Sequence, residues 1–202
     1  FVTKHNLKFI NESIYSRKLF AIESDFVEKN PNKVRFLKKE EDFDPKTEIK
    51  LLTNDKAGKM GRAKWFAAQK DVITQNQELV YKYQIAVSSA NAGGQKRDNQ
   101  IAIIDNYSAF GRSRLGLKSF ETLKEAENFL KYAKSSLVRF AFLLTDESLS
   151  SLGKEVPDVL DYSDDNDLID FDKDIDMQFI RLLGMTSQEY QYVVNRVEQI
   201  RN

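Results

Sequence analysis

The sequence contains no cysteine, one histidine and three prolines among its 202 residues. Without cysteine the chain cannot form disulfide bonds, thiolate zinc sites or cysteine nucleophiles, and this composition is compatible with a cytoplasmic setting. Because His5 is the only histidine, the composition argues against a histidine-based catalytic triad and against a multi-histidine metal centre.

Long apolar segments are also missing. No run approaches the roughly 20 residues that a membrane-spanning helix requires, and the N-terminus does not resemble a signal peptide, so we expect no membrane partner. The chain starts at Phe1 rather than at a methionine, which suggests a segment of a longer protein. With 41% hydrophobic residues, the length suffices for one well-packed domain, alone or with a small appendage.

The net charge is zero, but the charges are unevenly distributed. Residues 1–142 contain 26 Lys and Arg against 17 Asp and Glu, a balance of +9, whereas residues 143–202 contain 5 against 14, a balance of −9. A basic body with an acidic end is typical of nucleic-acid-binding proteins. Two oppositely charged regions that attract each other explain the same pattern, so both interpretations stay open.

The first 120 residues predict a mostly β structure of short strands between turns. From Leu79 to Val87 the odd positions are apolar, which is the alternation of a half-buried strand. The predicted strands are 33–37, 48–52, 63–66, 79–87 and 100–104.

From Thr122 onward the apolar residues recur at helical spacing, and Thr122 with Glu125 forms a capping-box pattern. We therefore predict one long helix over 122–144, whose apolar stripe covers a face of the sheet. Near the C-terminus two shorter helices are predicted, separated by Gly184 and a second capping pattern of Thr186 and Glu189.

These elements predict an α+β fold: a mixed β-sheet packed by one long helix, with a small helical C-terminal lobe. The sheet-rich domain with its long helix spans 1–145. An acidic linker and a C-terminal helical hairpin span 146–202.

Two acidic patterns could indicate metal chemistry. Residues 161–176 are rich in aspartate, but they lack the glycine that a calcium-binding loop of the EF-hand type requires, and Asp172 or Asp174 is better explained as a helix cap. Glu48 and Lys50, with Asp42 and Asp44 upstream, have the acid-x-lysine spacing of a metal-dependent nuclease. Because this spacing is common in charged proteins, a nuclease is kept only as an alternative. No Walker or G-x-G-x-x-G phosphate loop occurs.

Three glycine-bearing basic stretches are the most distinctive feature, and we expect all three to extend from one sheet. They are NDKAGKMGRAKW (54–65), SSANAGGQKRDN (88–99) and GRSR (111–114). Lys and Arg on such loops suit phosphate contacts, while Asn, Gln and Arg can read base edges. The candidate DNA-binding residues in these stretches are Lys56, Lys59, Arg62, Lys64, Asn91, Gln95, Lys96, Arg97, Arg112 and Arg114.

Several segments, in order along the chain, resemble one known family. SRKLFAIESDF (16–26) is similar to an S-R-K-P-F-G-L-x-T-N-F signature, although Leu19, Ala21 and Asp25 depart from it. YQIAVSSANAGG (83–94) resembles a K-V-x-I/L-S-x-A-x-x-G-G segment. Further matches are 119–122, 125–128, 138–140, 156–158, 169–171 and 186–192. Together they resemble the C-terminal target-recognition region of adenine-specific DNA methyltransferases of bacterial restriction-modification systems, the type II and IIG class.

The resemblance implies sequence-specific recognition of double-stranded DNA and adds Arg17 and Lys18 to the candidate DNA-binding residues. The Asn-Pro-Pro-aromatic motif of such enzymes is absent here, because Asn30 and Pro31 are followed by Asn32. The glycine-rich loop that binds S-adenosylmethionine is absent as well. We therefore expect no catalytic residue, metal or cofactor in this chain. S-adenosylmethionine and the adenine would bind a methyltransferase domain upstream in the same longer chain. A restriction-nuclease segment and a protein–protein interaction domain stay open as alternatives.

Overall fold

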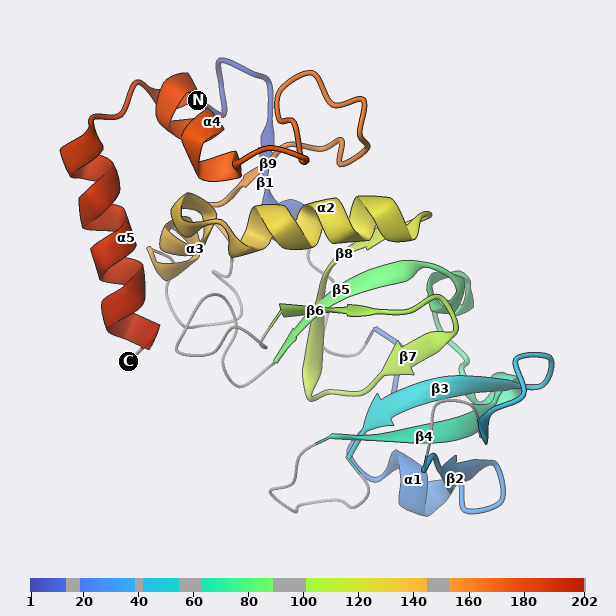
Figure 1. Cartoon of the computed structure of the whole chain (residues 1–202). Coiled ribbons are helices and arrows are strands. Elements are labelled where there is room, and N and C mark those ends of the chain that lie inside the picture. The colour runs from blue at the N-terminus through green and yellow to red at the C-terminus, as the bar shows by residue number, and fades with distance from the viewer. Residues whose placement is uncertain (14–18, 39–41, 55–62, 89–100, 145–152, 202) are drawn as a thin grey trace.

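The computed structural model describes residues 1–13, 19–38, 42–54, 63–88, 101–144 and 153–201 (Figure 1). Within this part of the chain the strands form three sheets. The four-stranded sheet has the order β2 (Val34–Phe36), β4 (Lys64–Gln69), β3 (Glu48–Thr53), β7 (Ser108–Phe110). The three-stranded sheet has the order β6 (Ile101–Ile104), β5 (Tyr83–Ser88), β8 (Arg114–Phe120). A short pair joins β1 (Lys8–Phe9) to β9 (Pro157–Asp158).

The helices gather mainly on one side of the three-stranded sheet (Figure 1). The α-helices are α1 (Phe26–Lys29), α2 (Leu123–Lys134), α3 (Ser136–Leu143), α4 (Ile175–Leu183) and α5 (Ser187–Arg201). Short 3₁₀ helices are η1 (Ile10–Ser13), η3 (Lys70–Val72) and η4 (Gln77–Tyr81).

The predicted α+β class is confirmed, and the four-stranded sheet is mixed because β3 and β7 run parallel. The predicted strand 79–87 is wrong in its first half: Leu79 and Tyr81 lie in η4, and β5 begins only at Tyr83. The strands β7 and β8 were not predicted. GRSR was interpreted as a loop, yet Arg114 is the first residue of β8.

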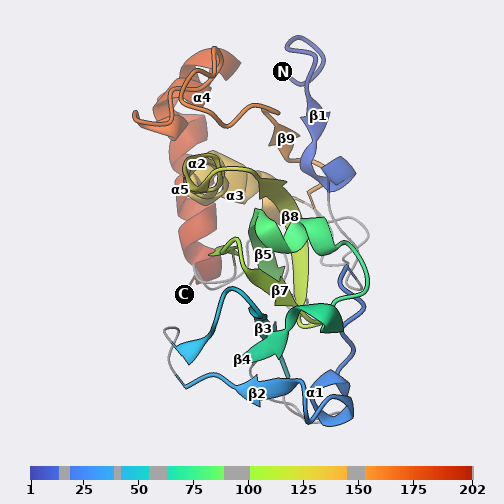
Figure 2. The ribbon, with the colours of Figure 1, turned by 90° about the vertical axis from the view of Figure 1, so that its right-hand side faces the viewer.

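The three-stranded sheet contributes residues to two hydrophobic cores, and it lies between α2 and the four-stranded sheet (Figure 2). Side chains alternate across β5, so Ile85 and Val87 pack in the core beneath α2 while Ala86 packs in the core of the four-stranded sheet. The C-terminal residues Tyr162 and Phe179 belong to the α2 core. Acidic linker and sheet therefore share one hydrophobic interior.

The predicted single helix over 122–144 is wrong at its centre. Ser135 is extended, with φ −62° and ψ 151°, and separates α2 from α3. The N-terminus of α3 is capped by a residue far away in the sequence. The Asp176 carboxylate accepts hydrogen bonds from the amides of Ser136 and Leu137, both at 2.9 Å. The predicted capping box of Thr122 and Glu125 is confirmed.

The C-terminal helices have the predicted start and stop signals. Asp174 caps α4 by accepting a hydrogen bond from the Met177 amide, and Gly184 ends it with φ +64°. Thr186 and Glu189 exchange the capping hydrogen bonds that open α5. The expected hairpin of these helices is not the main packing, since α5 packs chiefly along α3 (Figure 1).

Candidate nucleic-acid interface

The register of β3 and β7 brings two of the basic stretches to the same end of a sheet. Because these strands are parallel, with Leu52 opposite Phe110, both finish at that end. The Gly111 amide then donates to the Leu52 carbonyl at 2.9 Å. β4 begins there too, since Lys64 pairs with Thr53.

The third stretch leaves from the same end. β5 finishes at Ser88, which pairs with Arg114 at the start of β8, and the Arg114 amide donates to the Gly111 carbonyl at 3.0 Å. The described ends of all three stretches are therefore neighbours, and we call this place the convergent strand end. The stretches extend from two sheets rather than from the single sheet that the sequence suggested.

Gly111 makes the close approach of the turn after β7 to the end of β3 sterically feasible. A Cβ at this position would lie 2.3 Å from Thr53 Oγ1 and 3.2 Å from Ile22 Cγ2, so any side chain here would force Thr53 to shift. The glycine is thus required for packing rather than for chain flexibility. It fixes the turn 111–113 against the end of β3.

Three of the twelve predicted DNA-binding residues lie in the described part of the chain, namely Lys64, Arg112 and Arg114. All three are at the convergent strand end. The remaining predictions lie outside the described residues: Arg17, Lys18, Lys56, Lys59, Arg62, Asn91, Gln95, Lys96 and Arg97.

The three described cations differ in their surroundings. Lys64 is exposed at the start of β4. Arg112 forms an ion pair with Glu23, its Nη1 lying 2.7 Å from the carboxylate Oε2, and both side chains are partly exposed. Arg114 is half-buried and has no hydrogen-bond or ion-pair partner for its guanidinium in the described structure, and burial lowers the pKa of this group. Arg114 is therefore the cation here that gains most from a bound anion.

Two polar side chains at this end were missed by sequence reasoning. Asn54 Oδ1 and Ser113 Oγ are buried and have no hydrogen-bond partner. Asn54 follows the last residue of β3, and Ser113 precedes Arg114. The sequence gives no signal for them beyond turn-forming composition, because their burial depends on the packing of two sheets.

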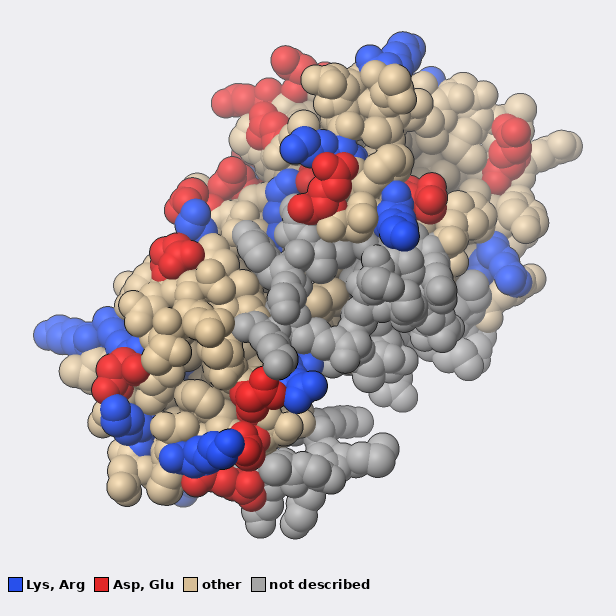
Figure 3. Space-filling model, turned by 180° about the vertical axis from the view of Figure 1, so that it is seen from behind, with Lys and Arg blue, Asp and Glu red and all other residues tan. Residues whose placement is uncertain are grey.

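The wider surface is not uniformly positive. On the face seen in Figure 3, Lys and Arg alternate with Asp and Glu among the described residues. Several cations of residues 118–131 contact acids of the C-terminal region, as in the Lys118–Asp158 and Lys124–Asp164 pairs at 2.6 and 3.3 Å. Part of the charge asymmetry is therefore used inside the molecule, as the second interpretation of the charge pattern expected.

The acid-x-lysine pattern is occupied by structural contacts. Both oxygens of Glu48 accept hydrogen bonds from Arg35, at 3.1 and 2.8 Å, and one of them also accepts from the Asp44 amide at 2.9 Å. The ammonium of Lys50 contacts Asp105 and is buried. These contacts direct Glu48 and Lys50 to different partners, so the geometry gives the nuclease alternative no support.

The aspartates of 161–176 cap turns and helices. Asp161 accepts a hydrogen bond from the Ser163 amide at 2.8 Å and Asp170 from the Asp172 amide at 3.0 Å. Across the described residues, no group of three or more His, Asp and Glu side chains is arranged to hold a metal ion.

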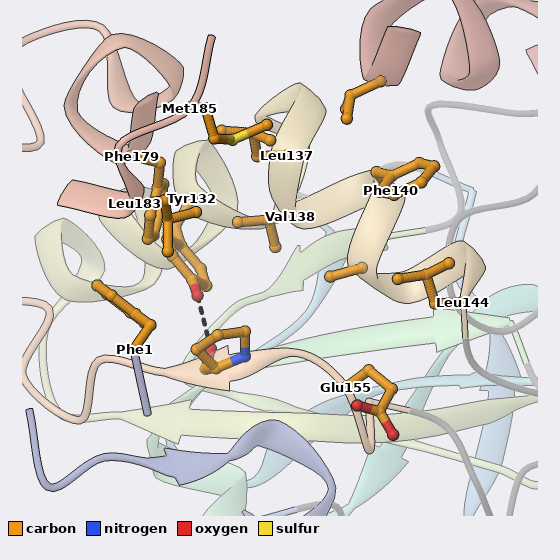
Figure 4. A pocket seen from close by; sticks show the side chains of 13 residues that line it. Phe1, Tyr132, Leu137, Val138, Phe140, Leu144, Glu155, Phe179, Leu183 and Met185 are labelled. Atoms are coloured by element: carbon orange, nitrogen blue, oxygen red, sulfur yellow. Dashed lines mark hydrogen bonds between the residues drawn. The ribbon is translucent and has the colours of Figure 1, made fainter. Parts of the chain in front are cut away.

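An apolar cavity of about 270 Å³ lies between α3, α4 and β9 (Figure 4). Its polar atoms are few. Tyr132 points toward Pro157 and donates its hydroxyl to that residue's carbonyl at 2.6 Å, and Glu155 lies at one end. The rest of its lining is apolar, and the Tyr132 hydroxyl is already used by the Pro157 carbonyl.

No protein-family model, curated protein or solved structure matches this chain. In the described part of the chain, no helix is long and apolar enough to cross a membrane.

Proposed function

We propose that this chain recognises a specific sequence of double-stranded DNA, as the target-recognition part of an adenine-specific methyltransferase of a bacterial restriction-modification system. The observation that carries the proposal is the convergent strand end, where the described ends of three basic stretches meet. Lys64, Arg112 and Arg114 bring positive charge to this end from different strands and turns.

Convergence matters because DNA binding needs several contacts at once. Phosphate contacts supply most of the affinity and orient the protein, while a few side chains read the base edges. The stretch SSANAGGQKRDN (88–99) contains the residue types for base reading, with Arg97 as the preferred reader of a guanine. A methyltransferase domain in the same longer chain would bind S-adenosylmethionine and the flipped adenine.

The proposal is tested by selecting bound duplexes from a randomised pool and measuring the affinity of the enriched sequence at two salt concentrations. We expect one enriched motif and a steep loss of affinity with salt, because several counterions are released on binding. A protein that binds no duplex, or that enriches no motif, contradicts the proposal. Magnesium-dependent cleavage of the pool would favour the nuclease alternative instead.

Arg97 offers a sharper form of this test. If it contacts a guanine through two hydrogen bonds, Arg97→Ala costs about 1–3 kcal/mol of binding free energy and relaxes the preference at one base pair. Unchanged affinity and motif in this variant would remove Arg97 from the recognition set.

A further inference from the structure

Three side chains with unmatched polar atoms lie in sequence next to the contact between Gly111 and the end of β3. Asn54 directly follows Thr53, whose side chain faces Gly111, and Ser113 and Arg114 complete the turn after that glycine. Asn54 Oδ1 and Ser113 Oγ are buried without a hydrogen bond. The Arg114 guanidinium is half-buried and unpaired within the described structure.

Such groups are unfavourable in the free protein, because each has lost hydrogen bonds to water without gaining others. The buried carboxylates of Asp158 and Asp176, by contrast, have hydrogen-bond donors at about 3 Å or less. Unmatched buried atoms also occur singly at Gln84 Oε1, Asn128 Oδ1 and Arg139 Nε, but Ser113 and Arg114 are neighbours in one turn, as in a site that its ligand completes.

The chemistry of Arg114 and Ser113 identifies the ligand class. A guanidinium and a hydroxyl both donate hydrogen bonds. An anion with several acceptor oxygens at different angles satisfies both, and a phosphate group has that form. The neighbouring cation Arg112 is less available, since it is already paired with Glu23.

We propose that Ser113 and Arg114 form a subsite for one phosphate group. This inference deepens the proposed function and rests on it in assigning the phosphate to the DNA backbone. The Gly111 contact holds the turn in place before binding, so little ordering is required when the phosphate arrives.

The experiment measures duplex affinity against salt concentration for the wild type, Arg114→Gln, Ser113→Ala and the matched control Arg181→Gln. Arg181 is an exposed arginine on α4, so its loss changes the net charge equally. For Arg114→Gln we expect about tenfold weaker binding and about one fewer counterion released, whereas the control keeps the wild-type slope.

Ser113→Ala separates binding from folding. Because the hydroxyl has no partner in the free protein, its removal should leave the free energy of unfolding unchanged or higher, while the affinity for DNA falls several-fold. Equal slopes for Arg114→Gln and Arg181→Gln, or full affinity in Ser113→Ala, would overturn the subsite while the proposed function still stands.

If the wild type binds no duplex, the proposed function fails and a second measurement decides the subsite. The Arg114 side-chain Nε–H signal is followed by heteronuclear NMR during titration with inorganic phosphate. A saturable shift that weakens in Ser113→Ala supports the subsite without DNA. An unchanged Arg114 signal overturns it.

Discussion

Charged side chains at the convergent strand end and in the C-terminal region differ in whether they have hydrogen-bond or ion-pair partners. In the C-terminal region the buried acids are matched to donors, as Asp158 is to Lys118 and Tyr162 and Asp176 is to the α3 amides. At the convergent strand end, Arg114 and Ser113 have no such partner. The comparison teaches that charge in the C-terminal region maintains the fold, whereas Arg114 at the convergent strand end has no partner within the described structure.

Among the substitutions that test this contrast, Asp158→Ala should have the largest effect on stability. Asp158 is buried, contacts the half-buried Lys118 at 2.6 Å, and accepts hydrogen bonds from Tyr162 and the Leu160 amide. Removing the carboxylate leaves the ammonium without its partner, so we expect the free energy of unfolding to fall by about 3–5 kcal/mol. Urea denaturation measures this change.

The matched control is Asp170→Ala, which removes an exposed carboxylate that pairs with Lys173 and accepts a hydrogen bond from the Asp172 amide. Exposed contacts contribute little, so its unfolding curve should shift much less than that of Asp158→Ala. Similar curves for the Asp158 and Asp170 variants would contradict the structural role of the buried Asp158 carboxylate.

A smaller loss is expected for Asp176→Ala. The carboxylate caps α3 through two amides and also accepts a 3.3 Å hydrogen bond from the Tyr190 hydroxyl. Losing a helix cap costs about 1–2 kcal/mol, and Asp176→Asn should recover part of it because one acceptor oxygen remains. Chemical denaturation of both variants, beside Tyr190→Phe, checks this order. Equal stability of the alanine and asparagine variants would contradict the capping role.

Glu48 tests whether a paired charge within the sheets behaves like those of the C-terminal region. Burial alone would raise the pKa of Glu48, but the Arg35 guanidinium and the Asp44 amide outweigh it, and the pKa lies below its ordinary value of 4.5. Its stabilisation is therefore present above that pH and lost as the pH falls through the lower, folded-state pKa.

Denaturation midpoints of the wild type and Glu48→Gln, measured from about pH 6 to about pH 3, should converge at acidic pH and separate near neutrality. The wild type is the more stable protein at the upper end. A constant difference across this range would show that the Glu48 charge contributes nothing.

The sequence predicted correctly those helix ends that depend only on residues close together in the chain. The Thr122 capping box and the αL end at Gly184 depend on a few neighbouring residues, and both are present. The break at Ser135 was invisible because its cap, Asp176, lies about 40 residues away in the sequence. The same holds for the site: basic stretches could be recognised from composition, but the Arg112–Glu23 pair and the unmatched Ser113 depend on long-range packing.

The substitution Lys64→Gln should have the smallest effect on the free energy of unfolding. Lys64 is exposed at the start of β4, opposite Thr53, so Lys64→Gln should change the free energy of unfolding by less than about 0.5 kcal/mol. If Lys64 contacts a phosphate, all duplexes should bind more weakly by a similar factor, with the slope of log affinity against log salt reduced by about 0.9. The control Lys29→Gln removes the same charge from a pair with Asp25 on α1. Because Lys29 lies on α1 rather than at the convergent strand end, its slope should match the wild type. Equal effects of the two variants would mean that net charge, rather than the convergent strand end, governs binding.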